Sequence, residues 1–228
     1  MTNEVEISVA MRDYLTEIYR IGQGEAWVST TVIADNLAVS GAATISMMRR
    51  LKDKDFLHYE RYKGVLLTEA GKHEALLSLR RYRLVERFLV DVLKFDWHDM
   101  HDEAEILVKQ INQRLEDRID EIMGYPTTCP HGAPIPTREG KLLERNDHPL
   151  TIVSEGTSGI VSHIQIREPE KLSYLAQIGL VPKTKFQLIS RAPFNGPLRV
   201  KIGRNEQVLS VDLAEGIWVI CNELTTIN

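Results

Sequence analysis

The sequence predicts an α+β protein with an N-terminal winged helix-turn-helix, a helical middle region and a C-terminal small β-barrel. Residues 8–53 carry three helical patterns separated by short turns, and residues 56–67 follow with β-type composition. Residues 159–221 carry short apolar segments between glycine and proline turns. Helices joined by short turns favour a helix-turn-helix, and many short strands favour a barrel.

The N-terminal elements follow from apolar spacing and capping residues. Apolar side chains recur at helical spacing in residues 8–22, so this segment predicts an amphipathic helix. Residues 29–38 begin with Ser and Thr, which can cap a short second helix, and residues 42–53 predict a third. Residues 59–67 predict a hairpin that turns near Lys63. A hairpin in this place is a wing.

The charge distribution predicts DNA binding by this region. The chain has a net charge of −4, yet residues 41–90 hold 11 basic and 6 acidic residues. Only the docking face of a DNA-binding protein must be positive. An ordinary charged surface, or a winged helix used for protein contact, is the alternative interpretation. The candidate contacts are small side chains at the start of the third helix and basic ones beyond it: Ser40, Ala42, Ala43, Thr44, Ser46, Arg49, Arg50, Arg61 and Lys63.

These residue types predict how double-stranded DNA would be read. The third helix would lie in the major groove with its N-terminal residues closest to base edges. Small side chains cannot make bidentate base contacts, so we expect few direct contacts to bases and a contribution of DNA shape to sequence recognition. The basic side chains would anchor phosphates.

The middle region predicts two long helices and an irregular linker. Residues 68–94 form one helical pattern and residues 98–123 another, and residues 124–149 hold five of the nine prolines. Long paired helices beyond a winged helix usually serve dimerisation, so we expect a homodimer. The second helix has a continuous apolar stripe: Ile106, Leu107, Ile111, Leu115, Ile119 and Ile122.

The C-terminal region predicts short strands around one helix. The expected helix spans residues 169–178. The expected strands are residues 159–166, 185–190, 198–202, 208–211 and 217–221. This pattern favours a small barrel.

Two clusters of side chains suggest a metal site. His101 and Glu105 stand four residues apart on one predicted helix face, within reach of one divalent ion. Cys129 and His131 lie in a Pro/Gly turn and suit Zn²⁺, Fe²⁺ or Mn²⁺. The alternatives are a surface ion pair for the first cluster and a buried thiol beside a solvated histidine for the second.

Composition and termini favour a cytoplasmic protein. The two cysteines are far apart in sequence, which argues for a reducing compartment. No apolar run approaches the about 20 residues that span a bilayer, and the N-terminus lacks a signal-peptide layout. We expect no membrane association. We also expect no enzyme, because the sequence shows no nucleophile motif or phosphate-cradling glycine loop.

Seven motifs spread over nearly the whole chain form a specific set: Asp13-Tyr14-Leu15-Thr16-Glu17-Ile18-Tyr19, Ser40-Gly41-Ala42-Ala43-Thr44, Leu67-Thr68-Glu69-Ala70-Gly71, Arg83–Leu89, His101–Ala104, Cys129–Pro136 and Leu175–Pro182. Together they resemble the diphtheria-toxin-repressor family of iron- and manganese-dependent transcriptional regulators. The resemblance implies a DNA-binding domain at 1–72, a dimerisation and metal-binding domain with its linker at 73–148, and an SH3-like (FeoA-like) domain at 149–228. It also implies a repressor of metal-uptake genes that responds to Mn(II) or Fe(II), with Zn(II) as a further candidate.

The resemblance also implies ligands. Asp13 and Glu105 match two ligands of the family's activating site, and this oxygen pair resembles the manganese-responsive branch. Glu86, His101, Cys129 and His131 match the family's second site, which we predict is the main metal site. Glu168 or Glu170 would add a carboxylate from the SH3-like domain.

Three positions depart from the family pattern. Val108 and Lys109 stand where the family usually has Glu-His in the activating site, and Tyr82 stands where a histidine ligand is common. Valine has no donor atom and lysine is a cation at pH 7, so a four-ligand activating site is not expected. One hypothesis is that the Lys109 ammonium reaches Glu105 one helical turn away, and Asp13, and replaces the metal's charge. The alternative is that Lys109 points to solvent.

Three functional interpretations remain open beside the metal-dependent repressor. The first is a regulator that is insensitive to Mn²⁺ or driven by another ligand, which operator binding with and without chelator separates from the main one. The second is a metal-dependent hydrolase, which needs an open coordination position and a nearby general base. In the third, the SH3-like domain binds a peptide or protein partner.

Overall fold

The computed structural model describes residues 7–143 and 145–221. The helices are α1 (Val9–Gly22), α2 (Thr30–Asn36), α3 (Gly41–Asp53), α4 (Glu69–Asp91), α5 (His101–Val108), α6 (Gln113–Ile122), α7 (Pro169–Gln177) and α8 (Val211–Glu215), with a short 3₁₀ turn at Leu150–Ile152. The strands are β1 (Leu57–Glu60), β2 (Gly64–Leu67), β3 (His148–Pro149), β4 (Ser158–Ile164), β5 (Lys185–Arg191), β6 (Leu198–Ile202), β7 (Asn205–Leu209) and β8 (Ile217–Cys221). Internal contacts divide the chain into two units, Met1–Tyr82 with Pro136–Leu142, and Arg83–Ile135 with Leu143–Asn228.

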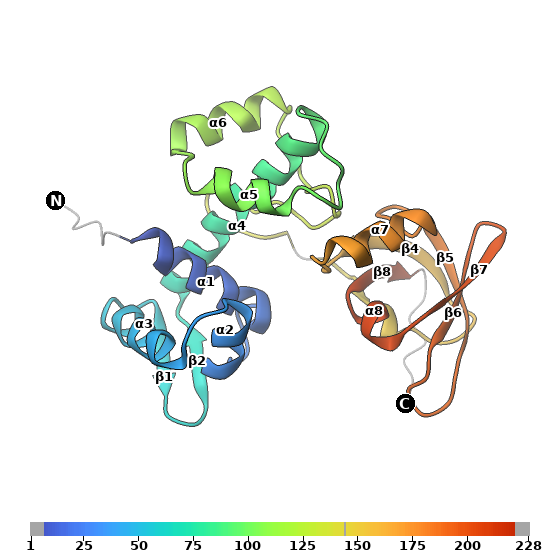
Figure 1. The fold of residues 1–228 in the computed structure, drawn as a ribbon, viewed down its shortest axis with the longest axis horizontal. Helices are drawn as coiled ribbons and strands as arrows, with labels where there is room; N and C mark the ends of the chain where they lie inside the picture. The colour runs from blue at the N-terminus through green and yellow to red at the C-terminus, as the bar shows by residue number, and fades with distance from the viewer. Residues whose placement is uncertain (1–6, 144, 222–228) are drawn as a thin grey trace. The chain divides into compact units, whose positions relative to one another are not determined.

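The first unit contains a winged helix-turn-helix, as the sequence predicts (Figure 1). Serine side chains cap α1, α2 and α3: Ser8 accepts from the backbone N–H of Met11, Ser29 from that of Thr31, and Ser40 from that of Ala43. These caps satisfy donors that a helix start leaves unpaired. The apolar faces of the helices and the hairpin form one core, which includes Met11, Leu15, Ile33, Met48, Leu51 and Val65.

The wing is the antiparallel hairpin β1–β2, registered from Leu57↔Leu67 to Glu60↔Gly64. Its tip turns through Tyr62, whose φ is 68°. Gly64 lies against the chain before α2, because a Cβ added there would meet the Val28 carbonyl oxygen at 2.1 Å. A bridge between Val28 and Val65 ties the wing to the helices.

The second long helix of the prediction is wrong: residues 98–123 form two helices, α5 and α6. α5 ends at Val108, and α6 begins after Asn112, whose side chain accepts from the Leu115 N–H at 3.0 Å. Asn112 has extended backbone angles, so it interrupts the helix and caps the next one. The apolar stripe therefore splits, with Ile111 and Ile119 buried and Ile106, Leu115 and Ile122 exposed.

The C-terminal part is an antiparallel sheet with α7 and α8 beside it (Figure 1). Within the described residues its strand order is β3-β8-β4-β5-β6-β7. Its interior is an apolar core that includes Val161, Leu172, Leu188, Val200 and Val219. The strand predicted at residues 208–211 begins and ends earlier, because β7 covers Asn205–Leu209. Ser210 instead caps α8 by accepting from the Leu213 N–H.

Within residues 7–143 and 145–221, no single helix is long and apolar enough to cross a membrane. α2 and α3 together meet the length and composition required of a span, but they are bent by 114° at the turn between them.

Candidate metal centre and nucleic-acid interface

Three side chains in the second unit converge on a buried point. Ligand atoms of Glu86, Cys129 and His131 all lie within 4.8 Å of one another, the one such group of three among residues 7–143 and 145–221. Each of the three side chains belongs to a residue that is at most 4% exposed. A carboxylate, a thiol and an imidazole are together a donor set for a divalent transition metal.

The local fold explains why these residues meet. Glu86 lies on α4, and Cys129 and His131 lie on a tight turn in which the Gly132 N–H donates to the Cys129 carbonyl at 3.0 Å and the Cys129 N–H to the Ala133 carbonyl at 2.9 Å. Arg83, about one helical turn before Glu86, donates from its guanidinium to the Pro134 carbonyl. The arginine therefore holds the turn against α4.

The protonation states at the centre differ from those in water. Burial raises the pKa of Glu86, but the hydrogen bond from His101 and the nearby His131 outweigh it, so its pKa lies below the ordinary value. Burial lowers the pKa of His131. Burial, with the nearby Glu86 charge, raises the pKa of Cys129 to about 12. Without a cation the group is therefore an ionised carboxylate, a neutral imidazole and a protonated thiol.

The orientation of His131 favours a cation. Its Nε2 lies 2.9 Å from the Trp97 carbonyl oxygen, which can only accept, so Nε2 carries the proton. The lone pair of Nδ1 then faces Glu86 Oε1, 3.8 Å away. Two acceptors that converge in a buried place are unfavourable unless a cation lies between them. The residues thus fit a metal ion, and Trp97 supplies the orienting contact typical of a metal-binding histidine.

His101, predicted as a fourth ligand of this site, lies beside the group but is not one of the three residues that form it. Its Nδ1 is 3.3 Å from Glu86 Oε1, and its ring stacks on that of His131 with centroids 5.0 Å apart. His101 is the first residue of α5. It therefore links the start of α5 to the carboxylate of the centre.

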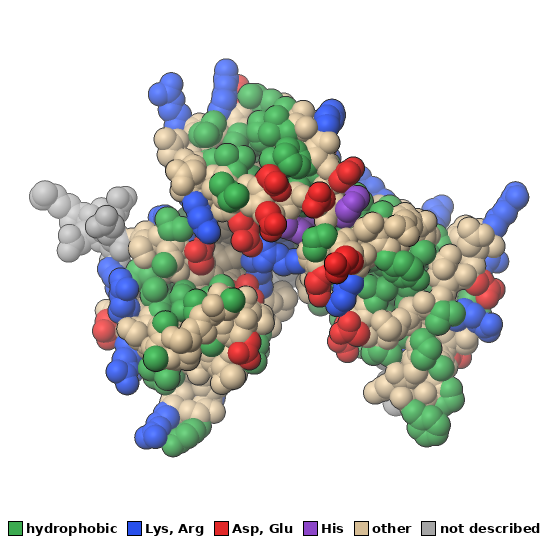
Figure 2. Space-filling view, in the orientation of Figure 1, with side chains coloured by type: hydrophobic (Ala, Val, Ile, Leu, Met, Phe, Trp, Pro, Cys, Tyr) green, Lys and Arg blue, Asp and Glu red, His purple; other side chains and the backbone are tan. Residues whose placement is uncertain are grey.

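The other predicted ligands lie on the surface. Asp13 is exposed on α1, in the first unit. Glu105 is exposed on α5, where Figure 2 shows acidic side chains gathered. Glu168 precedes α7 and pairs with Lys171 at 2.9 Å, and Glu170 is exposed on α7. The described structure brings none of these four carboxylates into the Glu86–Cys129–His131 group.

Of the two hypotheses for Lys109, the described contacts support the one in which Lys109 points to solvent. Glu105 instead forms an ion pair with Arg167, with 3.3 Å between Oε1 and Nη2. α5 ends at Val108, so Lys109 caps the helix and its side chain is exposed. Tyr82, at the other departure from the family pattern, is buried with its ring facing the Arg20 guanidinium at 5.0 Å.

The start of α3 offers a small, exposed face. Ser40, Ala42, Ala43 and Ser46 are exposed, as are Arg49 and Arg50 further along. Thr44 is fully buried, and its hydroxyl donates to the Ser40 carbonyl at 3.2 Å. The expectation that Thr44 contacts a base is therefore corrected, because the residue packs into the core.

The wing tip presents cations that are held by aromatic rings. The Arg61 guanidinium lies 4.8 Å from the Tyr62 ring centroid, and the Lys63 ammonium lies 3.9 Å from that of Trp27. Tyr62 is 93% exposed. Figure 2 shows basic and apolar side chains together at this tip. Such a tip suits a groove lined by phosphates.

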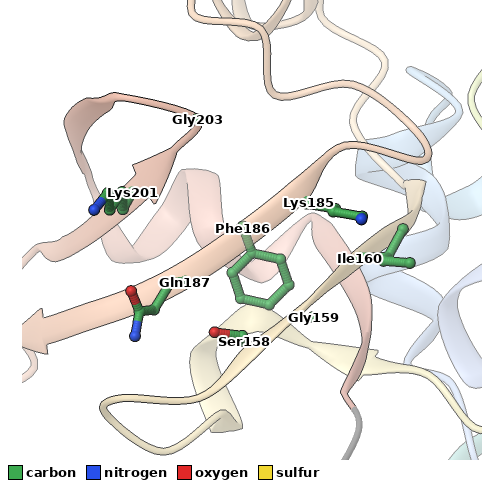
Figure 3. A pocket seen from close by; sticks show the side chains of 8 residues that line it. All are labelled: Ser158, Gly159, Ile160, Lys185, Phe186, Gln187, Lys201 and Gly203. Atoms are coloured by element: carbon green, nitrogen blue, oxygen red, sulfur yellow. The ribbon is translucent and has the colours of Figure 1, made fainter.

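A surface hollow of about 430 Å³ lies on the C-terminal sheet, apart from the metal group (Figure 3). Lys185, Gln187, Lys201 and the Phe186 ring are among the residues that line it. This lining offers no metal-ligand set, so the hollow does not extend the metal centre.

Sequence reasoning missed Arg83, Trp97 and Arg167. Arg83 had a usable signal, because it lies one helical turn from Glu86. Trp97 acts through its backbone carbonyl, which no residue type reveals. Arg167 is 62 residues from Glu105, and only the fold brings them together.

The fold and site define a class: a winged-helix DNA-binding protein with a candidate metal site on its helical domain. The chain matches three described families: "Iron dependent repressor, N-terminal DNA binding domain" at 6–65, "Iron dependent repressor, metal binding and dimerisation domain" at 68–137, and "FeoA domain" at 148–221. It belongs to the diphtheria-toxin-repressor family of metal-dependent regulators.

Individual relatives agree over nearly the full length. The diphtheria toxin repressor of Corynebacterium efficiens is 27% identical over 218 residues, covering 90% of this chain and 93% of that protein. A manganese-dependent transcriptional repressor solved in complex with manganese is 32% identical, with a TM-score of 0.85 over 92% of this chain and 99% of that one. ScaR with bound Zn²⁺ is 28% identical, with a TM-score of 0.81 over 92% and 98%.

Proposed function

We propose that this chain is a dimeric, Mn(II)-responsive transcriptional repressor of metal-ion uptake and homeostasis genes, which acts in the cytoplasm. The observation that carries the proposal is the buried group of Glu86, Cys129 and His131 in a chain that also holds a basic winged helix. Family membership and the manganese-dependent relatives support it. They are described as repressors, and no observation favours the hydrolase interpretation.

The donor set bears on the choice of ion. Carboxylate oxygen suits Mn²⁺ and Fe²⁺, and the thiolate of Cys129 also suits Zn²⁺. Relatives have been solved with manganese and with Zn²⁺. We propose Mn(II) as the physiological ion, with Fe(II) next and Zn(II) as a tight competitor in vitro. The bound ion supplies the positive charge that the converging acceptors of Glu86 and His131 require.

The protein's own residues would hold and orient the ion. Glu86 fixes it to α4, and Cys129 and His131 fix it to the turn that Arg83 holds. The Trp97 carbonyl keeps the His131 proton on Nε2, which leaves Nδ1 for the ion. Binding would therefore lock the turn onto α4, the helix that begins directly after the wing.

The homodimer is supported by unpaired apolar surface on the helical domain. Ile106 is 68% exposed and Ile122 61% exposed, and Leu115 and Tyr125 are also on the surface. A patch of large apolar side chains on a helix pair marks an interaction surface. We expect Ile122→Lys to shift the protein from dimer to monomer in analytical ultracentrifugation, and Lys141→Ala, on an exposed site outside the patch, to remain dimeric.

The test of metal dependence is an operator-binding isotherm. Purified protein should bind operator DNA with Mn²⁺ and lose most affinity with chelator. The double variant Cys129→Ala/His131→Ala should bind weakly in both conditions, with a lower metal content. Cys221→Ala, which removes the other thiol, is the matched control and should behave as wild type. Equal metal content in the double variant and wild type would refute the site.

A second candidate function is a regulator whose DNA binding needs no ion at the activating site. The observation that favours it is the Glu105–Arg167 ion pair, which already balances the Glu105 charge. Val108 and Lys109 also offer no metal ligand there. This candidate predicts the same operator affinity with and without chelator, whereas the main proposal predicts a loss.

A further inference from the structure

The C-terminal sheet holds the turn that carries the metal ligands. The Ile164 N–H, on β4, donates to the His131 carbonyl at 2.9 Å. The Arg145 guanidinium donates to the Gly132 carbonyl at 2.8 Å. Both acceptors belong to the turn itself, so the sheet fixes the backbone of a ligand residue and of its neighbour.

A buried polar network stands behind Arg145. The same guanidinium nitrogen donates to Ser162 Oγ at 3.2 Å, and Ser162 Oγ donates to Asp147 Oδ2. His163 Nδ1 lies 3.1 Å from the same carboxylate oxygen. The side chains of Asp147 and His163 are 7% and 8% exposed. A buried network in which each member has a partner is rigid and specifies one arrangement.

Gly132 shows how closely the turn meets the sheet. Its φ is 82°, and a Cβ added there would lie 2.3 Å from the Ser162 carbonyl oxygen. Ser162 is therefore in contact with the turn by its backbone and, through Arg145, by its side chain. The approach leaves little freedom for the neighbouring His131.

We infer that Arg145, Ser162 and Asp147 are positioning residues of the metal centre, acting through the carbonyl of Gly132 on the orientation of His131. The inference rests on the proposed metal site. Contacts outside the ligand set that orient a metal-binding histidine commonly change metal affinity about 10- to 100-fold. Because such coupling is reciprocal, metal binding also strengthens the attachment of β4 to the turn.

The test compares Mn²⁺ affinity across variants of the full-length protein. Arg145→Ala and Ser162→Ala should each weaken Mn²⁺ binding about 10-fold or more by calorimetry. The melting temperature of metal-free Arg145→Ala should change little, because Arg145 is exposed. Arg145→Lys, which keeps a cationic donor, should recover part of the loss. Thr184→Val is the matched control: it removes side-chain hydrogen bonds to Gly179 and Val181 in the same domain but none to the turn.

A second readout separates positioning from general stability. In wild type, Mn²⁺ should slow hydrogen exchange of the Ile164 amide, whose acceptor is the His131 carbonyl. In Arg145→Ala this metal-linked protection should shrink. Unchanged Mn²⁺ affinity in Arg145→Ala and Ser162→Ala overturns the inference while the proposed site stands. If wild type and Cys129→Ala/His131→Ala bind Mn²⁺ equally, the proposed site itself fails. If Ser162→Ala does not fold, the Mn²⁺ affinity of Arg145→Ala, at an exposed position, still tests the inference.

Discussion

Two acidic side chains of the second unit, Glu86 and Glu105, have opposite surroundings. Glu86 is 4% exposed and faces His101 and His131, whereas the Glu105 side chain is 54% exposed and faces Arg167. The Glu86 carboxylate lies in a low-dielectric interior, where its attraction to a nearby cation is strong. The Glu105 carboxylate is screened by water, which weakens the same attraction. A residue that matches a family metal ligand therefore predicts a metal site only where its carboxylate is buried beside other acceptors and has no cationic side chain paired with it.

Among the variants that test this difference, Glu86→Gln should have the largest effect on Mn²⁺ affinity. The amide keeps the shape of the side chain but removes the charge and one acceptor. Mn²⁺ affinity should fall by more than the about 100-fold that an orienting contact can give, as measured by calorimetry. Glu105→Gln is the control on the exposed side. A similar loss for both variants would show that the two carboxylates hold the ion together.

The pH dependence should be the next largest effect. The pKa of Cys129 is raised to about 12, so its proton must leave when a metal binds, and the lowered pKa of His131 means that this ring is already neutral near pH 7. Mn²⁺ affinity should therefore rise with pH, by up to about tenfold per unit between pH 6 and 8. Calorimetry in buffers of different ionisation enthalpy would count the released protons. A flat profile would mean that Cys129 does not bind as a thiolate.

The smallest effect should come from the exposed pair. Arg167→Ala removes a surface ion pair, which is worth at most about 1 kcal/mol and is weakened by salt. Thermal stability should change little at 0.15 M salt, and Mn²⁺ affinity at the buried centre should stay close to wild type. A large gain in metal stoichiometry in Arg167→Ala would instead show that the arginine excludes a second ion from Glu105.

The sequence predicted the winged helix well because its signals are local. Serines at positions 8, 29 and 40 cap the three helices, and a three-residue turn, Arg61–Lys63, closes the hairpin just before Gly64. The break after Val108 was hidden, because the apolar pattern continues across it while Asn112 starts a new helix. Domain boundaries at residues 72 and 148 stay a prediction.

The candidate site was predictable in part. Cys129 and His131 share a short turn, so their spacing alone brings them together, and the family resemblance grouped Glu86 and His101 with them. The partner of Glu105 could not be predicted, because Arg167 reaches it only through the docking of the C-terminal sheet. The position of Thr44 near the start of α3 predicted a base contact. Its side chain instead lies on the buried face of the helix, within the core.

The buried thiol of Cys129 has a chemical consequence. Oxidants and alkylating agents react with thiolates, and a thiol whose pKa is about 12 is almost entirely protonated at neutral pH. In a metal-free chain, the protonated Cys129 thiol would therefore react slowly to give sulfenic acid or a mixed disulfide. Burial thus protects the Cys129 thiol against oxidation and alkylation as well as fixing its position.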